Sequence, residues 1–230
     1  MRDETYVIVP FFNESSVIAA TVDMLSEHFS SIVCVDDGST DGGGETLREA
    51  DCTLVTHPVN LGQGAALQTG VDFALKDASA RFFVTFDADG QHRVQDALAM
   101  LDLLESSDVD IVFGSRFISG GGGPTGVRRM MLRLAVVFTN LSSGLSLTDT
   151  HNGLRAFNRR FAETLQIESD DMNHATEFIT HTSSGGFSYL EAPTEIVYTD
   201  YSLSKGQSLM NAVNIALDSV LDVFRRGRKP

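Results

Sequence analysis

The stretch Arg81–His92, RFFVTFDADGQH, decides how this sequence is to be interpreted. Its opening run is aromatic and β-branched after the leading arginine, which predicts a buried β-strand. Two carboxylates, Asp87 and Asp89, follow where the strand gives way to a loop, so their side chains can converge on one ion. Carboxylate, amide and imidazole groups suit a hard divalent cation that keeps some waters and bridges phosphate oxygens. Such an ion would serve a diphosphate leaving group.

Taken alone, an Asp-x-Asp pattern is more often a solvated turn, because Asp and Gly are common turn residues. The strand before it favours the ion site here, and so do polar residues that follow other predicted strands. The hypothesis therefore depends on the rest of the chain.

Composition limits the class of protein. A chain of 230 residues is long enough for one sizeable α/β domain. The net charge of −14 argues against general nucleic-acid binding, which needs a basic face. The two cysteines form no CxxC pattern and no disulfide framework is expected. No signal peptide and no run of about 18 apolar residues is visible, so a cytoplasmic location without a membrane span is expected.

Strand and helix patterns alternate through the first half. Apolar and β-branched runs predict strands at 6–10, 31–35, 53–56, 81–86 and 111–114, and periodicity predicts helices at 15–29, 46–50, 64–77, 95–105 and 173–181. This alternation predicts right-handed βαβ units and a mostly parallel sheet, which binds ligands at the carboxyl ends of its strands. Asp37, Asp87, Asp89 and Arg116 each follow a predicted strand, and that shared position marks them as a candidate site.

The second half leaves several alternatives open. Residues 119–126, with four consecutive glycines, are either a linker or a mobile lid over the site, and the lid is favoured. Residues 128–141 predict a helix whose apolar stripe is either core or an interfacial surface. The basic run at 225–230 is either solvated or in contact with anionic lipid headgroups.

Five motifs in the first 120 residues occur in the order typical of one enzyme family: VPFFNE at 9–14, VDDGSTD at 35–41, NLGQGAA at 60–66, DADGQH at 87–92 and GSRF at 114–117. The chain thereby resembles family 2 glycosyltransferases of GT-A fold. A later segment, DTHNGLRA at 149–156, is similar to one in the polyprenyl-phosphate sugar synthases, such as dolichyl-phosphate mannose synthase. The resemblance implies a Rossmann-like, mostly parallel sheet flanked by helices.

The resemblance implies a single GT-A domain over residues 1–230. Residues 1–118 would form the half that binds the nucleotide sugar. Residues 119–230 would form the acceptor side, with the glycine-rich loop and the basic tail.

On the donor side, Pro10, Glu14 and Asp37 match positions that frame the nucleotide's base and ribose, and Gln63 falls in the same donor-binding set. Each carboxylate has a plainer alternative as a helix cap or turn residue. Asp87, Asp89 and Gln91 match the positions that hold Mg²⁺ or Mn²⁺ against the diphosphate. Asp87 is also assigned to donor binding and Asp89 to catalysis. His92 is expected behind these ligands rather than among them.

On the acceptor side, Arg116 and one of Arg128 or Arg129 match positions linked to the acceptor phosphate or the diphosphate. Lys205 falls where the synthases carry a basic residue near the diphosphate. Arginine offers planar bidentate contacts and lysine a point charge. Arg155 is assigned to substrate binding with a surface salt bridge as its alternative.

These roles imply inversion by in-line attack at the sugar C1, with the metal stabilising the departing nucleoside diphosphate. The expected acceptor is polyprenyl phosphate, which is already an anion and needs no base, and the expected donor is a GDP- or UDP-hexose. The alternative is a sugar hydroxyl of a cell-surface polysaccharide or glycolipid, which needs a carboxylate base such as Asp170, Asp171 or Glu177.

Two other functions are disfavoured. A nucleotide-sugar-binding module without turnover would not need intact metal and basic positions. A nucleotidyltransferase would show a basic, Gly-rich loop near the N-terminus, and residues 10–20 contain no Gly, Lys or Arg. Many polyprenyl-phosphate synthases carry C-terminal membrane helices that are not visible here. Contact with the cytoplasmic face of the membrane, or a separate anchoring subunit, is therefore expected.

Overall fold

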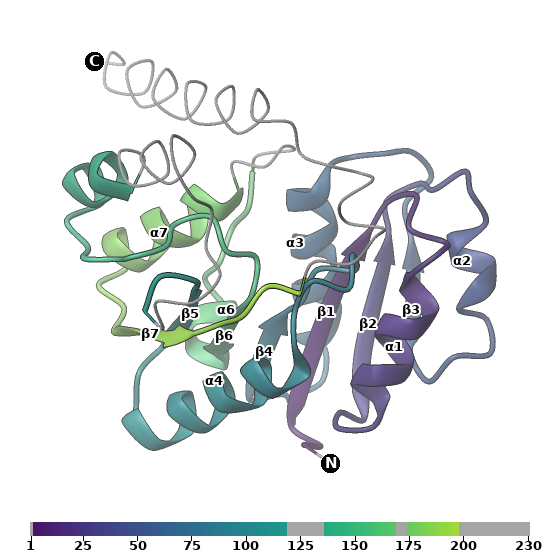
Figure 1. Cartoon of the computed structure of the whole chain (residues 1–230), viewed down its shortest axis with the longest axis horizontal. Helices are drawn as coiled ribbons and strands as arrows, with labels where there is room; N and C mark the ends of the chain where they lie inside the picture. Colours follow the sequence, from purple (N-terminus) through teal and green to yellow (C-terminus); the bar gives the residue numbers. More distant parts are fainter. Residues whose placement is uncertain (1, 119–135, 169–173, 198–230) are drawn as a thin grey trace.

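The computed structural model describes residues 2–118, 136–168 and 174–197, which are arranged around one central sheet (Figure 1). The sheet has seven strands in the order β3-β2-β1-β4-β6-β5-β7. They are β1 Thr5–Phe11, β2 Ser31–Asp36, β3 Thr53–Thr56, β4 Phe82–Thr85, β5 Ile111–Ser115, β6 Arg155–Asn158 and β7 Tyr189–Pro193. All pairings except those of β6 are parallel, which confirms the predicted α/β class.

Helices cover both faces of the sheet because its central strands are apolar on both sides. Along β1, Val7 and Val9 pack into one core cluster and Ile8 into another, as the alternation of a strand requires. The first cluster includes side chains of α1 (Ile18–Ser26) and α4 (Val94–Ser107). The second includes side chains of α3 (Gln63–Ala74), α6 (Arg159–Ala162) and α7 (His174–Ser184).

The five predicted strands are all present, and two of the predicted helices begin three residues away from their expected starts. The helix expected at 46–50 is α2, Gly43–Thr46, where Asp41 Oδ1 accepts a hydrogen bond of 3.0 Å from the Gly43 amide. The helix expected from residue 15 starts at Ile18, because Val17 before it has a non-helical φ of −130°. The Ser15 amide lies in the loop before the helix and donates to Asp41 Oδ2 at 2.8 Å.

Strand β6 was not predicted, and it lies antiparallel between β4 and β5. Its first residue, Arg155, is opposite Thr85 of β4 and Phe113 of β5. Because β6 runs against its neighbours, its start lies at the edge where the parallel strands end. Of the helix expected at 128–141, residues up to 135 lie outside the described part, and residues 136–143 are helical.

Asp110 holds the opposite edge of the sheet together. Its buried carboxylate accepts hydrogen bonds from the Ser188 amide (2.9 Å), the Ser188 hydroxyl (2.9 Å) and Asn158 Nδ2 (3.1 Å), and it pairs with Arg160 at 3.0 Å. Burial alone would raise the pKa of Asp110, but these donors outweigh it and hold that pKa below its ordinary value. The side chain therefore joins β5 to the segments that lead out of β6 and into β7.

Asp110→Ala should lower the free energy of unfolding at neutral pH by roughly 3 kcal/mol, because buried donors lose a charged acceptor. Because the folded pKa is depressed, this contribution is present above about pH 4 and is lost as the pH falls through the folded value. Urea unfolding of both proteins at pH 7 and pH 3 measures it, with exposed Asp51→Ala as the control, expected within about 0.5 kcal/mol of wild type. An equal gap between wild type and Asp110→Ala at both pH values would contradict this.

Within the described ranges, none of the helices combines the length and the apolar composition that crossing a bilayer requires.

Candidate functional site

Polar residues collect at the carboxyl edge of the sheet. Strands β1, β2, β4 and β5 end at Phe11, Asp36, Thr85 and Ser115. The candidate residues that directly follow these ends are Glu14, Asp37, Asp87, Asp89, Gln91 and Arg116. Pro10 is buried within β1, and Arg155 opens the antiparallel β6 at the same edge. The structure thus places these residues along one edge of the sheet.

Asp37 is buried, and its carboxylate organises the neighbouring loop. Oδ1 accepts from the Leu61 amide and from His57 Nδ1, each at 2.8 Å, and Oδ2 accepts from the Gly62 amide at 2.8 Å. His57 in turn contacts Thr69 Oγ1 of α3 at 2.9 Å. Asp37 therefore fixes the loop that leads into α3, and its contact with a base or ribose stays a prediction. His57 was not selected from the sequence, although it directly follows β3.

Two neighbouring side chains hold the carboxylate of Asp87. Gln63 Nε2 donates to its Oδ1 at 3.0 Å, and His92 Nε2 donates to its Oδ2 at 3.0 Å. Burial would raise the pKa of Asp87, but the hydrogen bond and charge of His92 and the charge of Arg155 bring it down to about 2. The carboxylate is therefore ionised at neutral pH. His92 is buried against Asp87, and its place behind the metal ligands stays a prediction. Gln63, assigned to donor binding, hydrogen-bonds the Asp87 carboxylate.

The pKa of Asp89 is shifted in the opposite direction, upward. Burial and the charge of Asp87 raise the pKa of Asp89, and the charge of Glu14 adds to this effect. The Gln91 amide donates to Asp89 Oδ1 at 3.0 Å and so fixes the turn between them. Two carboxylates held close enough to repel one another are a place where a cation is stabilised.

The donor set fits Mg²⁺ or Mn²⁺ bound together with a substrate. Within the described residues, no three His, Cys, Asp or Glu side chains are grouped to hold an ion by themselves. Asp87 and Asp89 provide two carboxylates, and Mg²⁺ in phosphate-transfer sites is commonly held by one or two carboxylates, waters and phosphate oxygens. A diphosphate would complete the coordination, and the metal-binding role of Asp87, Asp89 and Gln91 stays a prediction.

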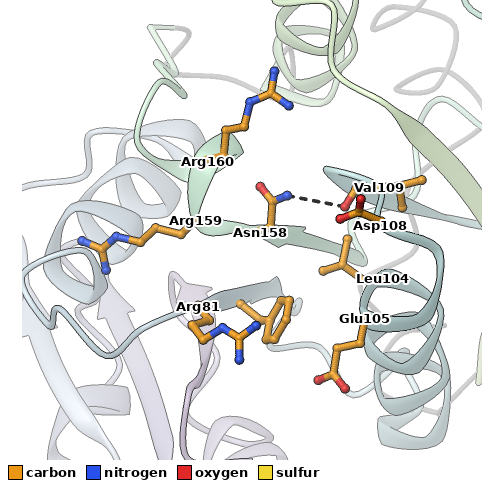
Figure 2. A pocket seen from close by; sticks show the side chains of 9 residues that line it. Arg81, Leu104, Glu105, Asp108, Val109, Asn158, Arg159 and Arg160 are labelled. Carbon is orange, nitrogen blue, oxygen red and sulfur yellow. Dashed lines mark hydrogen bonds between the residues drawn. The ribbon is translucent and has the colours of Figure 1, made fainter.

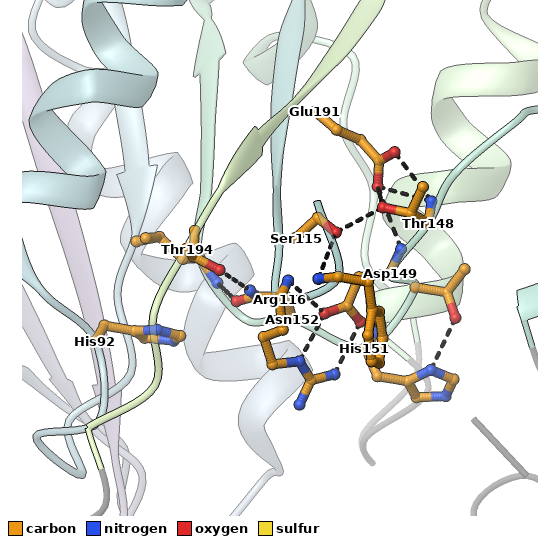
Figure 3. A network of polar contacts seen from close by, with 12 residues as sticks. His92, Ser115, Arg116, Thr148, Asp149, His151, Asn152, Glu191 and Thr194 are labelled. Atoms are coloured by element: carbon orange, nitrogen blue, oxygen red, sulfur yellow. Dashed lines mark hydrogen bonds and ion pairs between the residues drawn. The ribbon is translucent and has the colours of Figure 1, made fainter. Parts of the chain in front are cut away.

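Arg116 is held by a bidentate ion pair that the sequence did not reveal. Its Nε donates to Asp149 Oδ2 at 2.6 Å and its Nη2 to Asp149 Oδ1 at 2.8 Å. Figure 3 shows the guanidinium against this carboxylate, within a network from β5, β7 and the loop before β6. Burial would raise the pKa of Asp149, but Arg116 outweighs it and keeps that pKa below its ordinary value. The orientation of the Arg116 guanidinium is therefore set by Asp149.

Glu191 of β7 hydrogen-bonds the same loop, and no signal in the sequence identified it. Its carboxylate accepts from the Thr148 amide at 2.8 Å and from the Asp149 amide at 3.2 Å. Burial raises the pKa of Glu191, and the charge of Asp149 adds to this. Thr148 also contacts Ser115 at the end of β5 at 2.6 Å. Glu191 thereby helps to hold Asp149 under Arg116.

Arg155 lies inside the protein rather than on its surface. Only 2% of it is exposed, its guanidinium lies over the Phe178 ring at 4.5 Å, and its Nη1 donates to the Gly153 carbonyl at 3.2 Å. Burial lowers the pKa of Arg155 to about 10, a decrease that the charges of Asp87 and Asp149 limit. The surface salt-bridge alternative does not apply, and a direct contact with substrate stays a prediction.

Three predicted basic residues, Arg128, Arg129 and Lys205, lie outside the described residues, as do Asp170 and Asp171. The predicted lid at 119–126 and the basic tail also lie outside them. Glu177, the remaining alternative base, is on α7 and accepts a hydrogen bond from the Glu168 amide at 3.4 Å.

A separate pocket of about 310 Å³ opens at the other edge of the sheet, between the start of β4, the end of α4 and α6 (Figure 2). Its three arginines are already engaged by the chain. Arg81 pairs with Glu4 at 3.0 Å, Arg159 donates to main-chain carbonyls such as that of Asp77, and Arg160 pairs with Asp110. This pocket is distant in the fold from the carboxylates at the carboxyl edge.

Comparison with known proteins agrees with this geometry. Residues 6–166 match the model of the family described as glycosyl transferase family 2. The chain is 30% identical to polyprenol monophosphomannose synthase of Mycolicibacterium smegmatis, over 97% of this chain and 88% of that protein. It is 28% identical to UDP-N-acetylglucosamine–dolichyl-phosphate N-acetylglucosaminyltransferase of Methanococcus voltae, over 89% of this chain and 90% of that protein.

Among solved structures, the chain is similar to glucosyl-3-phosphoglycerate synthase from Mycobacterium tuberculosis in complex with Mn²⁺, UDP and glucosyl-3-phosphoglycerate. The TM-score is 0.70 at 16% identity, over 96% of this chain and 80% of that chain. At this identity the likeness concerns the fold, and it confirms the predicted GT-A architecture.

Proposed function

Because this chain belongs to glycosyl transferase family 2, we propose that it transfers a hexose from a GDP- or UDP-sugar to polyprenyl phosphate, with inversion at the sugar C1. One observation carries the proposal: the carboxylates of Asp87 and Asp89 and the clamped guanidinium of Arg116 lie at the same edge of one sheet. The first suits a metal-bound diphosphate and the second suits an anionic acceptor.

On the donor side, Pro10, Glu14 and Asp37 frame the nucleotide, and Asp87, Asp89 and Gln91 hold Mg²⁺ or Mn²⁺ against the diphosphate. The metal supplies charge stabilisation for the departing nucleoside diphosphate. Gln63 and His92 orient Asp87 through their hydrogen bonds, and His92 also lowers the pKa of that carboxyl. The Mn²⁺ and UDP of the related solved complex support divalent-metal use.

On the acceptor side, Arg116 presents a guanidinium that can bind a phosphate in two places. Arg128, Arg129 and Lys205 add positive charge in this proposal. Arg155 acts on the substrate through its positive charge, which lies near Asp87 and Asp149. A phosphate oxygen attacks C1 without a general base. The names of the mycobacterial and methanogen relatives support a polyprenyl or dolichyl phosphate acceptor.

A lipid-linked acceptor implies work at a membrane surface. We propose peripheral contact through the segments beyond residue 118 that sequence analysis singled out, or through a separate anchoring subunit. Binding to anionic liposomes by the purified chain, in a co-sedimentation assay, would distinguish the first route from the second.

The acceptor class can be tested directly. Purified protein is incubated with Mn²⁺ or Mg²⁺, radiolabelled GDP- and UDP-hexoses, and either polyprenyl phosphate or the same polyprenol without its phosphate. We expect label in the organic phase as a mild-acid-labile lipid with the phosphate only. Label that enters only a saccharide acceptor, with none in the lipid, would reject the proposal in favour of the hydroxyl-directed alternative.

A further inference from the structure

The segment 149–155 touches both sides of the proposed site. It comprises the loop that precedes β6 and the first residue of that strand. Its sequence, DTHNGLR, was singled out by resemblance, but the proposed function gives no role to most of it. Within it, Asp149 contacts Arg116 and Gly153 contacts Asp87, the two groups on which the proposed reaction depends.

At one end, Asp149 clamps Arg116. The side chain of Asp149 is 2% exposed and that of Arg116 is 19% exposed, so the pair is shielded from water on the Asp149 side. The Asp149 carboxylate also accepts from the Arg116 main-chain amide at 3.2 Å. Side chain and main chain of Arg116 are therefore fixed by the same carboxylate.

At the other end, Gly153 lies directly against Asp87. A Cβ atom added to Gly153 would be 2.0 Å from Asp87 Oδ2 and 2.7 Å from Asp87 Cγ, closer than real side chains approach. The φ angle of Gly153 lies outside the left-handed region, so the backbone itself would accept a side chain. The three atoms nearest to such a Cβ all belong to the carboxylate of Asp87.

The middle of the segment is fixed from several directions. The Gly153 carbonyl accepts from Thr85 Oγ1 at 2.7 Å and from Arg155 Nη1 at 3.2 Å. Asn152 Nδ2 donates to Thr194 Oγ1 at 2.7 Å, as Figure 3 shows. With its carbonyl tied to β4 and its neighbour tied to the residue after β7, Gly153 cannot retreat from Asp87 without breaking these bonds.

We propose that residues 149–153 act as a rigid spacer that sets the position of Asp87 relative to Arg116. Gly153 positions the metal-binding carboxylate, and Asp149 positions the acceptor-binding guanidinium. The inference rests on the proposed function for the identity of the two ligands. It predicts that a change at Gly153 weakens donor binding and leaves acceptor binding intact. A change at Asp149 does the reverse.

Gly153→Ala should displace the Asp87 carboxylate. Calorimetric titration with Mn²⁺ and UDP, or GDP, should show nucleotide affinity in the presence of metal at least about tenfold weaker, while affinity for polyprenyl phosphate stays within about twofold of wild type. Gly186→Ala is the matched control: it places a side chain at a φ of +63° with no atom within 4 Å, so it strains the backbone without touching the site.

Asp149→Asn should give the reverse pattern. Without the charge that orients it, Arg116 should bind acceptor less well, and the KM for polyprenyl phosphate should rise at least about tenfold. The affinity for Mn²⁺ with nucleotide should stay within about twofold of wild type. A merely structural role would weaken both ligands in both variants, and that result would overturn the inference.

The contact itself can be tested without ligand. Gly153→Ala should lower the melting temperature in the wild-type background and have no such effect in an Asp87→Ala background, where the clash is absent. An equal loss in both backgrounds would overturn the inference, and the Asp87→Ala background also serves if Gly153→Ala alone does not fold. The nucleotide titration needs no acceptor, so failure of the proposed acceptor leaves the Gly153 result interpretable.

Discussion

Asp89→Ala should reduce metal-dependent sugar transfer on the order of 10³-fold, because the ion that neutralises the leaving diphosphate loses one of its two carboxylates. The same change should not destabilise the protein in the absence of metal. Burial and the charge of Asp87 raise the pKa of Asp89, so its ionised form costs stability at neutral pH and removing it relieves that cost. Initial rates with saturating Mn²⁺ and thermal melts without metal measure the two effects.

Asp23→Ala is a suitable control, since Asp23 is an exposed carboxylate on α1 away from the carboxyl edge. It should leave both rate and melting temperature unchanged. Activity retained by Asp89→Ala within tenfold of wild type would remove Asp89 from the proposed metal site. A lower melting temperature would show instead that Asp89 has a structural role.

Arg116→Gln should lower transfer to polyprenyl phosphate by roughly 10²–10³-fold, because a preorganised guanidinium at the acceptor is lost. It should also cost roughly 3 kcal/mol of stability, because Asp149 is left as a buried, uncompensated charge. Rates measured across polyprenyl phosphate concentrations, together with urea unfolding, give both quantities.

The double variant Arg116→Gln/Asp149→Asn separates these effects. With neither charge present, most of the stability should return, since a buried ion pair contributes little beyond satisfying its own partners. Transfer activity should stay low. Recovery of activity together with stability would mean that Arg116 supports the fold and does not serve the acceptor.

The strands and the edge at which the site forms could be predicted because their signals are local. Runs such as FFVT of β4 are apolar and contain β-branched residues. They are followed by charged residues that can bind a metal ion or a phosphate. The order of βαβ units then places the strand ends, and with them Asp37, Asp87 and Arg116, at one edge without any knowledge of long-range contacts.

The contacts that complete the site could not be predicted because they join residues far apart in the chain. Arg116 and Asp149 are 33 positions apart, and their pairing depends on β6 entering the sheet between β4 and β5. Strand β6 has only four residues and begins with a charged one, so it carries no strand signal. The closest obstacle to a side chain at position 153 is Asp87, a neighbour in space and not in sequence.

The placement of β6 also bears on how the protein is synthesised. In the described sheet, β5 pairs only with β6 and β7, and β4 gains its second neighbour only from β6. A growing chain on the ribosome that has reached residue 118 therefore carries β5 with no strand to join, although every residue of the predicted donor side has been made. Strands β1 to β4 pair with one another without β6, but β5 can join them only when residues 155–158 have emerged. The two predicted halves therefore share one sheet, which β6 connects.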